Sequence, residues 1–139
     1  MKNRYKGFDS RSKEAFNIAQ LGSLLAQRQE FLSVLRYDVN GADVISTNPL
    51  SQVSRHIQVK SRPTVSKNYI GKDLWIAFPQ WSSTKSQSWY LIPHDLLLQT
   101  WGKEAQVQLK GVNNADKLSK KLSAQLAEFN VGTATFEAE

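Results

Sequence analysis

Apolar side chains recur at helical spacing in the first part of the chain. A helix is predicted to begin with Ser12 as N-cap and Glu14 in its first turn, and to end near residues 27–29, where the pattern changes. The side chains expected to face the core are Ala15, Ile18, Ala19, Gly22 and Leu25, flanked by Phe16, Leu21 and Leu24.

The middle of the chain has the pattern of strands. Apolar, β-prone runs predict strands at residues 31–37, 43–47, 55–62, 74–78 and 89–92. The pairs Asn40-Gly41 and Asn48-Pro49 are typical of turns, and Pro63 is expected to end the third strand. Residues 80–88 (QWSSTKSQS) have the composition of a loop.

Helical patterns return after the strands. A short helix is predicted from Pro93-His94-Asp95 to Trp101, and an amphipathic helix over residues 114–129, where Leu118, Leu122 and Leu126 share one face. Residues 105–109 are a possible small strand, and residues 131–139 are expected to be mobile or an edge strand. This order of elements predicts a mixed α/β sheet with helices on both sides.

Length and charge narrow the class of protein. The 139 residues are expected to form a single domain (1–139) with a flexible or loosely docked basic arm at residues 1–11. The net charge of +6 suits a polyanion such as nucleic acid, and equally a solvated basic surface. The absence of cysteine excludes disulfides, thiolate zinc sites and cysteine nucleophiles.

The chain shows no signal for a membrane or for secretion. No apolar run approaches the roughly 20 residues of a membrane helix. The beginning of the chain, MKNRYKGFDSRSK, lacks the apolar core of a secretory signal. We therefore expect a cytoplasmic or nucleoid-associated protein that is not secreted and has no membrane partner.

Candidate chemistry is concentrated on the second and third predicted strands. Gln58 and Lys60 are two residues apart, so they point to the same side while Ile57 and Val59 face the core. A hairpin that brings Asp43 near this pair places a carboxylate, an amide oxygen and an ammonium together. That set can bind a hard cation and activate water against a phosphodiester.

These residues give the chain a resemblance to a known family. Gly41-Ala42-Asp43 is similar to a G-x-D motif on one strand, and Gln58-Val59-Lys60 to an (E/Q)-x-K motif on the next. With the helix glutamate Glu14, residues 12–100 resemble the PD-(D/E)XK, or restriction-endonuclease-like, nuclease superfamily. The chain looks most like its small members of the Holliday-junction-resolvase, homing or restriction type. It departs from the pattern where Gly41-Ala42 replaces the proline, and where the amide Gln58 replaces an acid.

The resemblance implies a fold, an activity and a cofactor. The fold is a restriction-endonuclease-like core of the αβββαβ type. The activity is hydrolysis of DNA by a divalent-metal-dependent endonuclease that uses Mg²⁺ or Mn²⁺ and works as a homo-oligomer, a dimer or larger. The implied metal ligands are Asp43, Gln58, Glu14 and the backbone carbonyl of Val59. Lys60 joins Asp43, Gln58 and Glu14 as a catalytic residue, because it would activate water.

Four basic residues are candidates for contact with DNA phosphates: Lys13, Arg55, Arg62 and Lys67. Trp81 could stack on a base or pack at the edge of the core. The two histidines, His56 and His94, are too few and too far apart for a zinc site.

Simpler interpretations of the same residues remain open. Asp43 could hydrogen-bond the preceding turn, and Glu14 could stabilise a helix N-terminus, with Gln20 as another candidate for its place. A lysine such as Lys60 is most often a solvated charge. Two other classes of protein therefore stay in view: a DNA-binding module with a nuclease-like fold and no turnover, and a structural or interaction protein.

Overall fold

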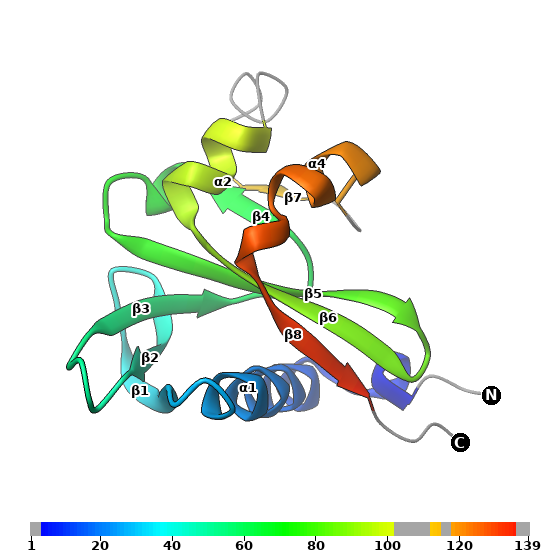
Figure 1. Ribbon diagram of the computed structural model, residues 1–139, viewed down its shortest axis with the longest axis horizontal. Helices are drawn as coiled ribbons and strands as arrows, with labels where there is room; N and C mark the ends of the chain where they lie inside the picture. The colour runs from blue at the N-terminus through cyan, green and yellow to red at the C-terminus, as the bar shows by residue number, and fades with distance from the viewer. Residues whose placement is uncertain (1–3, 102–111, 115–117, 136–139) are drawn as a thin grey trace.

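The protein has three layers. The computed structural model describes residues 4–101, 112–114 and 118–135. A six-stranded mixed sheet forms the middle layer, with α1 (Ser10–Ala26) on one face and α2 (His94–Trp101) and α4 (Lys120–Gln125) on the other (Figure 1). The predicted α/β class, a mixed sheet flanked by helices, is therefore confirmed.

The strands of the main sheet follow the order β1-β2-β3-β5-β6-β8. Adjacent strands in this sheet run antiparallel, except for β3 and β5, which run parallel to each other. Their bounds are β1 (Phe31–Val39), β2 (Ala42–Thr47), β3 (Ser54–Val59), β5 (Leu74–Ser83), β6 (Ser86–Pro93) and β8 (Asn130–Thr135).

The connection from β3 to β5 departs from the αβββαβ order. It contains β4 (Thr64–Ser66) and the 3₁₀ helix η2 (Lys67–Tyr69), with no α-helix in the segment between the two strands. β4 leaves the main sheet and pairs with β7 (Val112–Asn114) to form a second sheet of two strands. The first α-helix after the third strand is α2, which comes only after β6.

The first helix begins earlier than predicted. Asp9, not Ser12, is the N-cap, because the Asp9 carboxylate accepts a hydrogen bond of 2.7 Å from the Ser12 backbone nitrogen. The predicted core face is confirmed for Leu25 and the flanking Leu21 and Leu24, and it is wrong for Ala15 and Ala19, which are exposed. The buried residues of α1 are Asn17, Leu21, Leu24 and Leu25. This face buries larger apolar side chains than the alanine stripe, which makes it the more stable choice.

The predicted loop at residues 80–88 is wrong. β5 continues to Ser83 and β6 begins at Ser86, so most of this polar segment forms a hairpin. The Gln87 side chain is fully buried, and its Oε1 accepts a hydrogen bond of 2.9 Å from Trp89 Nε1. Cross-strand partners on both sides of β6 thus override the loop-like composition.

Two segments near the ends of the described chain, residues 4–7 and 130–135, have regular structure. Arg4–Gly7 form the 3₁₀ helix η1, and Tyr5 is buried, so this part of the arm is firmly docked. The helix predicted at 114–129 is shorter: α4 spans Lys120–Gln125, and the 3₁₀ helix η3 (Ala127–Phe129) follows. Residues 130–135 form β8 at the edge of the sheet, so the edge-strand alternative is correct for residues 131–135, while residues 136–139 lie outside the described residues. The strand predicted at 105–109 lies outside the described residues.

Two hydrophobic cores lie on the two faces of the sheet. On the α1 side, Leu21 and Leu25 pack with Val44, Ile57 and Trp89. On the other side, residues of α2 and α4 pack against β5 and β6, and the predicted Leu118, Leu122 and Leu126 are buried there. None of the helices in the described ranges is long and apolar enough to cross a membrane.

Replacing Leu21 by alanine should lower the free energy of unfolding by about 2–5 kcal/mol, because a fully buried leucine leaves a cavity. Leu50→Ala is the control, since Leu50 is 82% exposed and its loss should cost less than about 0.5 kcal/mol. Urea unfolding followed by circular dichroism measures both. Equal shifts in the two variants would contradict the assignment of the core face of α1.

Candidate functional site

The side of α1 that faces the sheet is polar in the first half of the helix and apolar in the second half. Ser10, Lys13, Glu14 and Asn17 are spaced so that they share one side of its first two turns. The same side continues into Leu21, Leu24 and Leu25, which are buried. The leucines anchor the second half of the helix on the sheet, and the first half holds polar side chains toward the site described next.

A polar cavity of about 370 Å³ lies where the first turns of α1 meet the beginning of β2 and the end of β3. Its lining brings together all five residues predicted as ligands or catalytic groups, together with Lys13. The residues that line it are Ser10, Lys13, Glu14, Asn17, Asp43, Gln58, Val59, Lys60 and Ser61.

The hydrogen bonding of β2 to β3 explains why these side chains meet. The ladder between the two strands ends at the pair Val44 and Ile57. One step further, the Val59 backbone nitrogen donates to Asp43 Oδ2 at 3.0 Å. The Asp43 carboxylate thus takes the place of a backbone acceptor and is held at the end of β3.

Lys60 is positioned by the neighbouring strand. Its backbone nitrogen donates to the Ala77 carbonyl of β5 at 2.8 Å, which extends the parallel pairing of β3 and β5 by one residue. Ile57 and Val59 are buried, as predicted, while Gln58 and Lys60 are half-buried and line the cavity. The alternation along β3 therefore places the amide and the ammonium beside the carboxylate.

Burial raises the pKa of Asp43 above its ordinary value. The hydrogen bond from Val59 opposes this effect, the nearby Glu14 carboxylate adds to it, and the Lys60 ammonium opposes it. The charged form of Asp43 is thus disfavoured in the folded protein by the sum of these effects. A cation bound beside the carboxylate would reverse that balance.

The donors in the cavity fit a hard cation. Asp43 and Glu14 offer carboxylates, Gln58 an amide oxygen and Val59 a backbone carbonyl. Among the described residues, no group of three or more His, Cys, Asp or Glu side chains could hold a metal ion. All four donors are oxygens, and such a set suits Mg²⁺ or Mn²⁺, which accept neutral oxygens and keep several waters, better than zinc.

Asn17 and Ser61 are lining residues that the sequence analysis did not assign. The Asn17 Nδ2 donates to Tyr5 Oη at 3.1 Å and to Ser61 Oγ at 3.2 Å, and the Tyr5 hydroxyl donates to Ser61 Oγ at 2.9 Å. Asn17 Oδ1 is buried without a hydrogen-bond partner in the described part of the chain. A signal for Asn17 is its position one turn before Leu21, where it is the polar member of the buried set Asn17, Leu21, Leu24 and Leu25.

Three of the four basic residues predicted to bind DNA do not line the cavity. The Arg55 guanidinium lies 3.1 Å from the Glu30 carboxylate and 4.7 Å from the centre of the Trp75 ring. Arg62 and Lys67 are exposed, outside the cavity. Lys13 lines it, so the structure brings only this one of the four to the candidate site.

Comparisons with protein-family models, curated proteins and solved structures find no match to this chain. The function proposed below therefore depends on the residues of the cavity.

Asp43→Asn should stabilise the protein at neutral pH. Because the folded-state pKa of Asp43 is raised, stability falls as pH rises from the ordinary aspartate value of 3.8 through the raised value, and stays lower above it. Asparagine removes this loss and still offers an oxygen to the Val59 N–H. Urea midpoints across this pH range measure the difference, which should vanish at pH values below 3.8.

Asp73→Asn is the matched control. Asp73 is exposed and has a φ of +53°, which asparagine also tolerates, so the urea midpoint should stay nearly constant. A lower midpoint for Asp43→Asn than for the wild type at neutral pH would contradict the electrostatic account.

Proposed function

We propose that this protein is a divalent-metal-dependent endodeoxyribonuclease with a restriction-endonuclease-like core of the PD-(D/E)XK superfamily. One observation carries the proposal: α1, β2 and the end of β3 bring Glu14, Asp43, Gln58 and Lys60 into one cavity. A DNA substrate would place the protein in the cytoplasm or at the nucleoid.

In this proposal each residue has a defined task. Asp43 and Glu14 hold the cation with their carboxylates, and Gln58 and the Val59 carbonyl complete the protein ligands. The bound ion would lower the pKa of a coordinated water and offset charge on the phosphodiester. Lys60 orients the attacking water and stabilises the negative charge that develops on the phosphate. Lys13 contacts a phosphate oxygen.

The charge of the cavity supports an anionic substrate once a cation is present. Its charged lining residues are two carboxylates, Asp43 and Glu14, and two ammonium groups, Lys13 and Lys60. Their formal charges cancel, so a divalent cation would leave the cavity positive. Phosphodiester binding is then favourable, and it depends on the metal.

A second candidate function is a DNA-binding module with this fold and no turnover. The observation that favours it is Gln58, which supplies a dipole where a carboxylate would supply a charge, and so weakens the hold on the cation. Metal-independent and salt-sensitive DNA binding without cleavage would support the module. The absence of any DNA affinity at low salt would leave an interaction protein.

A cleavage assay separates these functions. Supercoiled plasmid and labelled single-stranded, duplex and branched oligonucleotides are incubated with Mg²⁺, with Mn²⁺ or with EDTA. We expect cleavage only with a metal, and a loss of about 100-fold or more in rate for Asp43→Asn and Lys60→Ala. Mn²⁺ should also raise the melting temperature of the wild type and not that of Asp43→Asn.

Two exposed residues outside the cavity provide controls for this assay. Asp73→Asn repeats the same chemical change as Asp43→Asn, and Lys72→Ala repeats that of Lys60→Ala. Both controls should cleave at the wild-type rate. Metal-dependent cleavage that survives in Asp43→Asn and Lys60→Ala would show that the activity belongs to another site or to a contaminant.

We also propose that a second copy of the chain docks on the edge strand β1. An antiparallel edge is self-complementary about a two-fold axis, and an exposed apolar edge favours such pairing. Beside it, a mostly apolar hollow of about 400 Å³ is lined by Val34 and by Ala15, Ile18 and Ala19 of α1, with two charged residues of α1, Arg11 and Glu14. The large apolar side chains that β1 exposes are Phe31 (53%), Val34 (68%), Tyr37 (76%) and Val39 (43%).

Light scattering during size-exclusion chromatography tests this interface. We expect a dimer for the wild type and a monomer for Val34→Lys, because the substitution places a charge in the proposed contact. Leu50→Lys is the control: Leu50 is 82% exposed in the turn between β2 and β3, and this variant should remain dimeric. A monomeric wild type, or a dimeric Val34→Lys, would overturn the proposed interface.

A further inference from the structure

A second cavity, of about 470 Å³, lies next to the first. It is formed by η1, the beginning of α1 and the tip of the β5–β6 hairpin, which lie together at one end of the molecule (Figure 1). Its lining residues are Tyr5, Lys6, Lys13, Trp81, Ser82, Ser83 and Thr84.

The two cavities are neighbours. Lys13 lines both of them. Tyr5 lines the second, and its hydroxyl donates to Ser61 of the first at 2.9 Å. Lys13 and the hydrogen bond between Tyr5 and Ser61 therefore connect the two linings, so a ligand that extends from one cavity to the other would pass beside Lys13.

An ordered aromatic ring lines the second cavity. Trp81 packs against Phe16, with an angle of 10° between the rings and 6.4 Å between their centres. It also contacts Tyr5, whose ring centre is 5.2 Å away. These contacts fix the orientation of the indole before any ligand binds, so stacking on it costs little conformational entropy.

The polar part of the lining selects for an anion. Lys6 is exposed, and the Lys13 ammonium lies 5.3 Å from the centre of the Tyr5 ring, which positions it at the cavity. None of the described residues that line this cavity is acidic. Three hydroxyl side chains at the hairpin tip, Ser82, Ser83 and Thr84, add hydrogen-bonding groups.

We propose that this second cavity binds an unpaired nucleotide of the DNA strand, with its base against Trp81 and its phosphate near Lys6 and Lys13. The inference rests on the proposed function, because the nucleotide would adjoin the phosphodiester in the first cavity. A base inside a duplex is stacked on both sides and cannot reach the indole. The substrate class is therefore DNA with a single-stranded or extruded nucleotide beside the point of cleavage.

Affinity measured in EDTA tests the proposal without involving cleavage. Fluorescence anisotropy compares a labelled twelve-nucleotide oligothymidylate with a blunt duplex of equal length. We expect tighter binding of the single strand. Trp81→Leu should weaken it by roughly 5- to 100-fold while leaving duplex binding nearly unchanged, and Trp81→Tyr should restore most of the affinity. Urea unfolding verifies that each variant is folded.

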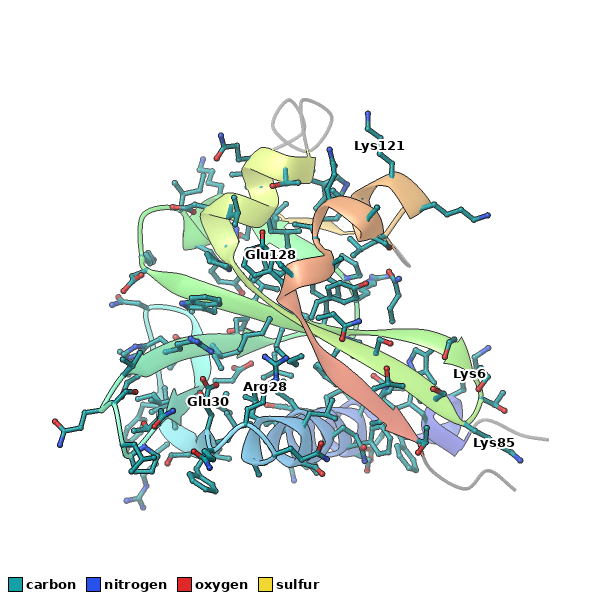
Figure 2. The ribbon with its side chains drawn as sticks, viewed as in Figure 1. Lys6, Arg28, Glu30, Lys85, Lys121 and Glu128 are labelled. Carbon is teal, nitrogen blue, oxygen red and sulfur yellow. The ribbon has the colours of Figure 1, made fainter. Side chains whose placement is uncertain are left out.

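Lys6→Ala provides a second test that does not perturb the core. Removing one phosphate contact should lower the slope of log affinity against log salt by about 0.7 for the single strand. Lys121→Ala is the matched control: this lysine is also exposed but lies on α4, across the sheet from α1 (Figure 2). Its slope should equal that of the wild type.

The outcomes of the two proposals can be told apart. Single-strand binding that depends on Trp81 and Lys6, without metal-dependent cleavage, supports the nucleotide site and overturns the nuclease. Cleavage that depends on Asp43, with unchanged single-strand affinity in folded Trp81→Leu and Lys6→Ala, overturns the nucleotide site and leaves the nuclease standing. Equal affinity of the wild type for single strand and duplex also overturns it.

Discussion

The candidate site depends on the hydrogen bond from the Val59 backbone nitrogen to the Asp43 carboxylate. At this point β2 and β3 stop exchanging backbone hydrogen bonds, and a side chain takes over as acceptor. A buried N–H needs a partner, so the carboxylate is retained at the end of β3 although burial disfavours its charge. The same bond continues the ladder of paired residues that holds the two strands at a fixed distance. This distance, together with the alternation of side chains between the two faces of β3, determines where Gln58 and Lys60 lie relative to the carboxylate.

The helix α1 closes the site because its packing is divided along its length. Leu21 and Leu25 are fully buried against the sheet, which anchors the second half of the helix. The first half can then carry polar groups such as Glu14 over the cavity, at little cost in stability. Asn17 lies at the boundary and binds both Tyr5 and Ser61. That boundary links the N-terminal 3₁₀ helix to the end of β3, so the two cavities share one supporting network.

The sequence could predict that Gln58 and Lys60 lie near Asp43, because the side chains of a strand point to only two sides. Ile57 is fully buried, and moving the register of β3 by one residue would expose it. The register of β3 is therefore strongly determined. The face of α1 was less determined, since the alanine and leucine stripes have the same period and only the sheet decides between them. The hairpin at residues 80–88 could not be predicted from composition, because β6 gains partners on both sides only after β8 has folded back. No pattern in the chain marked Tyr5 as buried, since its partners are distant in sequence.

The glutamine at position 58 has a physical consequence for a site of this kind. Burial and the Glu14 carboxylate already disfavour the charged form of Asp43. An acid in place of Gln58 would add a third negative charge to the cavity, and like charges would raise the cost further. The amide avoids that cost and keeps the charged lining residues balanced against Lys13 and Lys60. The amide also gives a bound cation one negative ligand fewer than an acid would. Compared with an acid at position 58, glutamine therefore makes the metal-free protein more stable and lowers its affinity for metal. In the proposed nuclease, a cation would therefore gain much of its affinity from the phosphate of the substrate, and metal binding and DNA binding would reinforce each other.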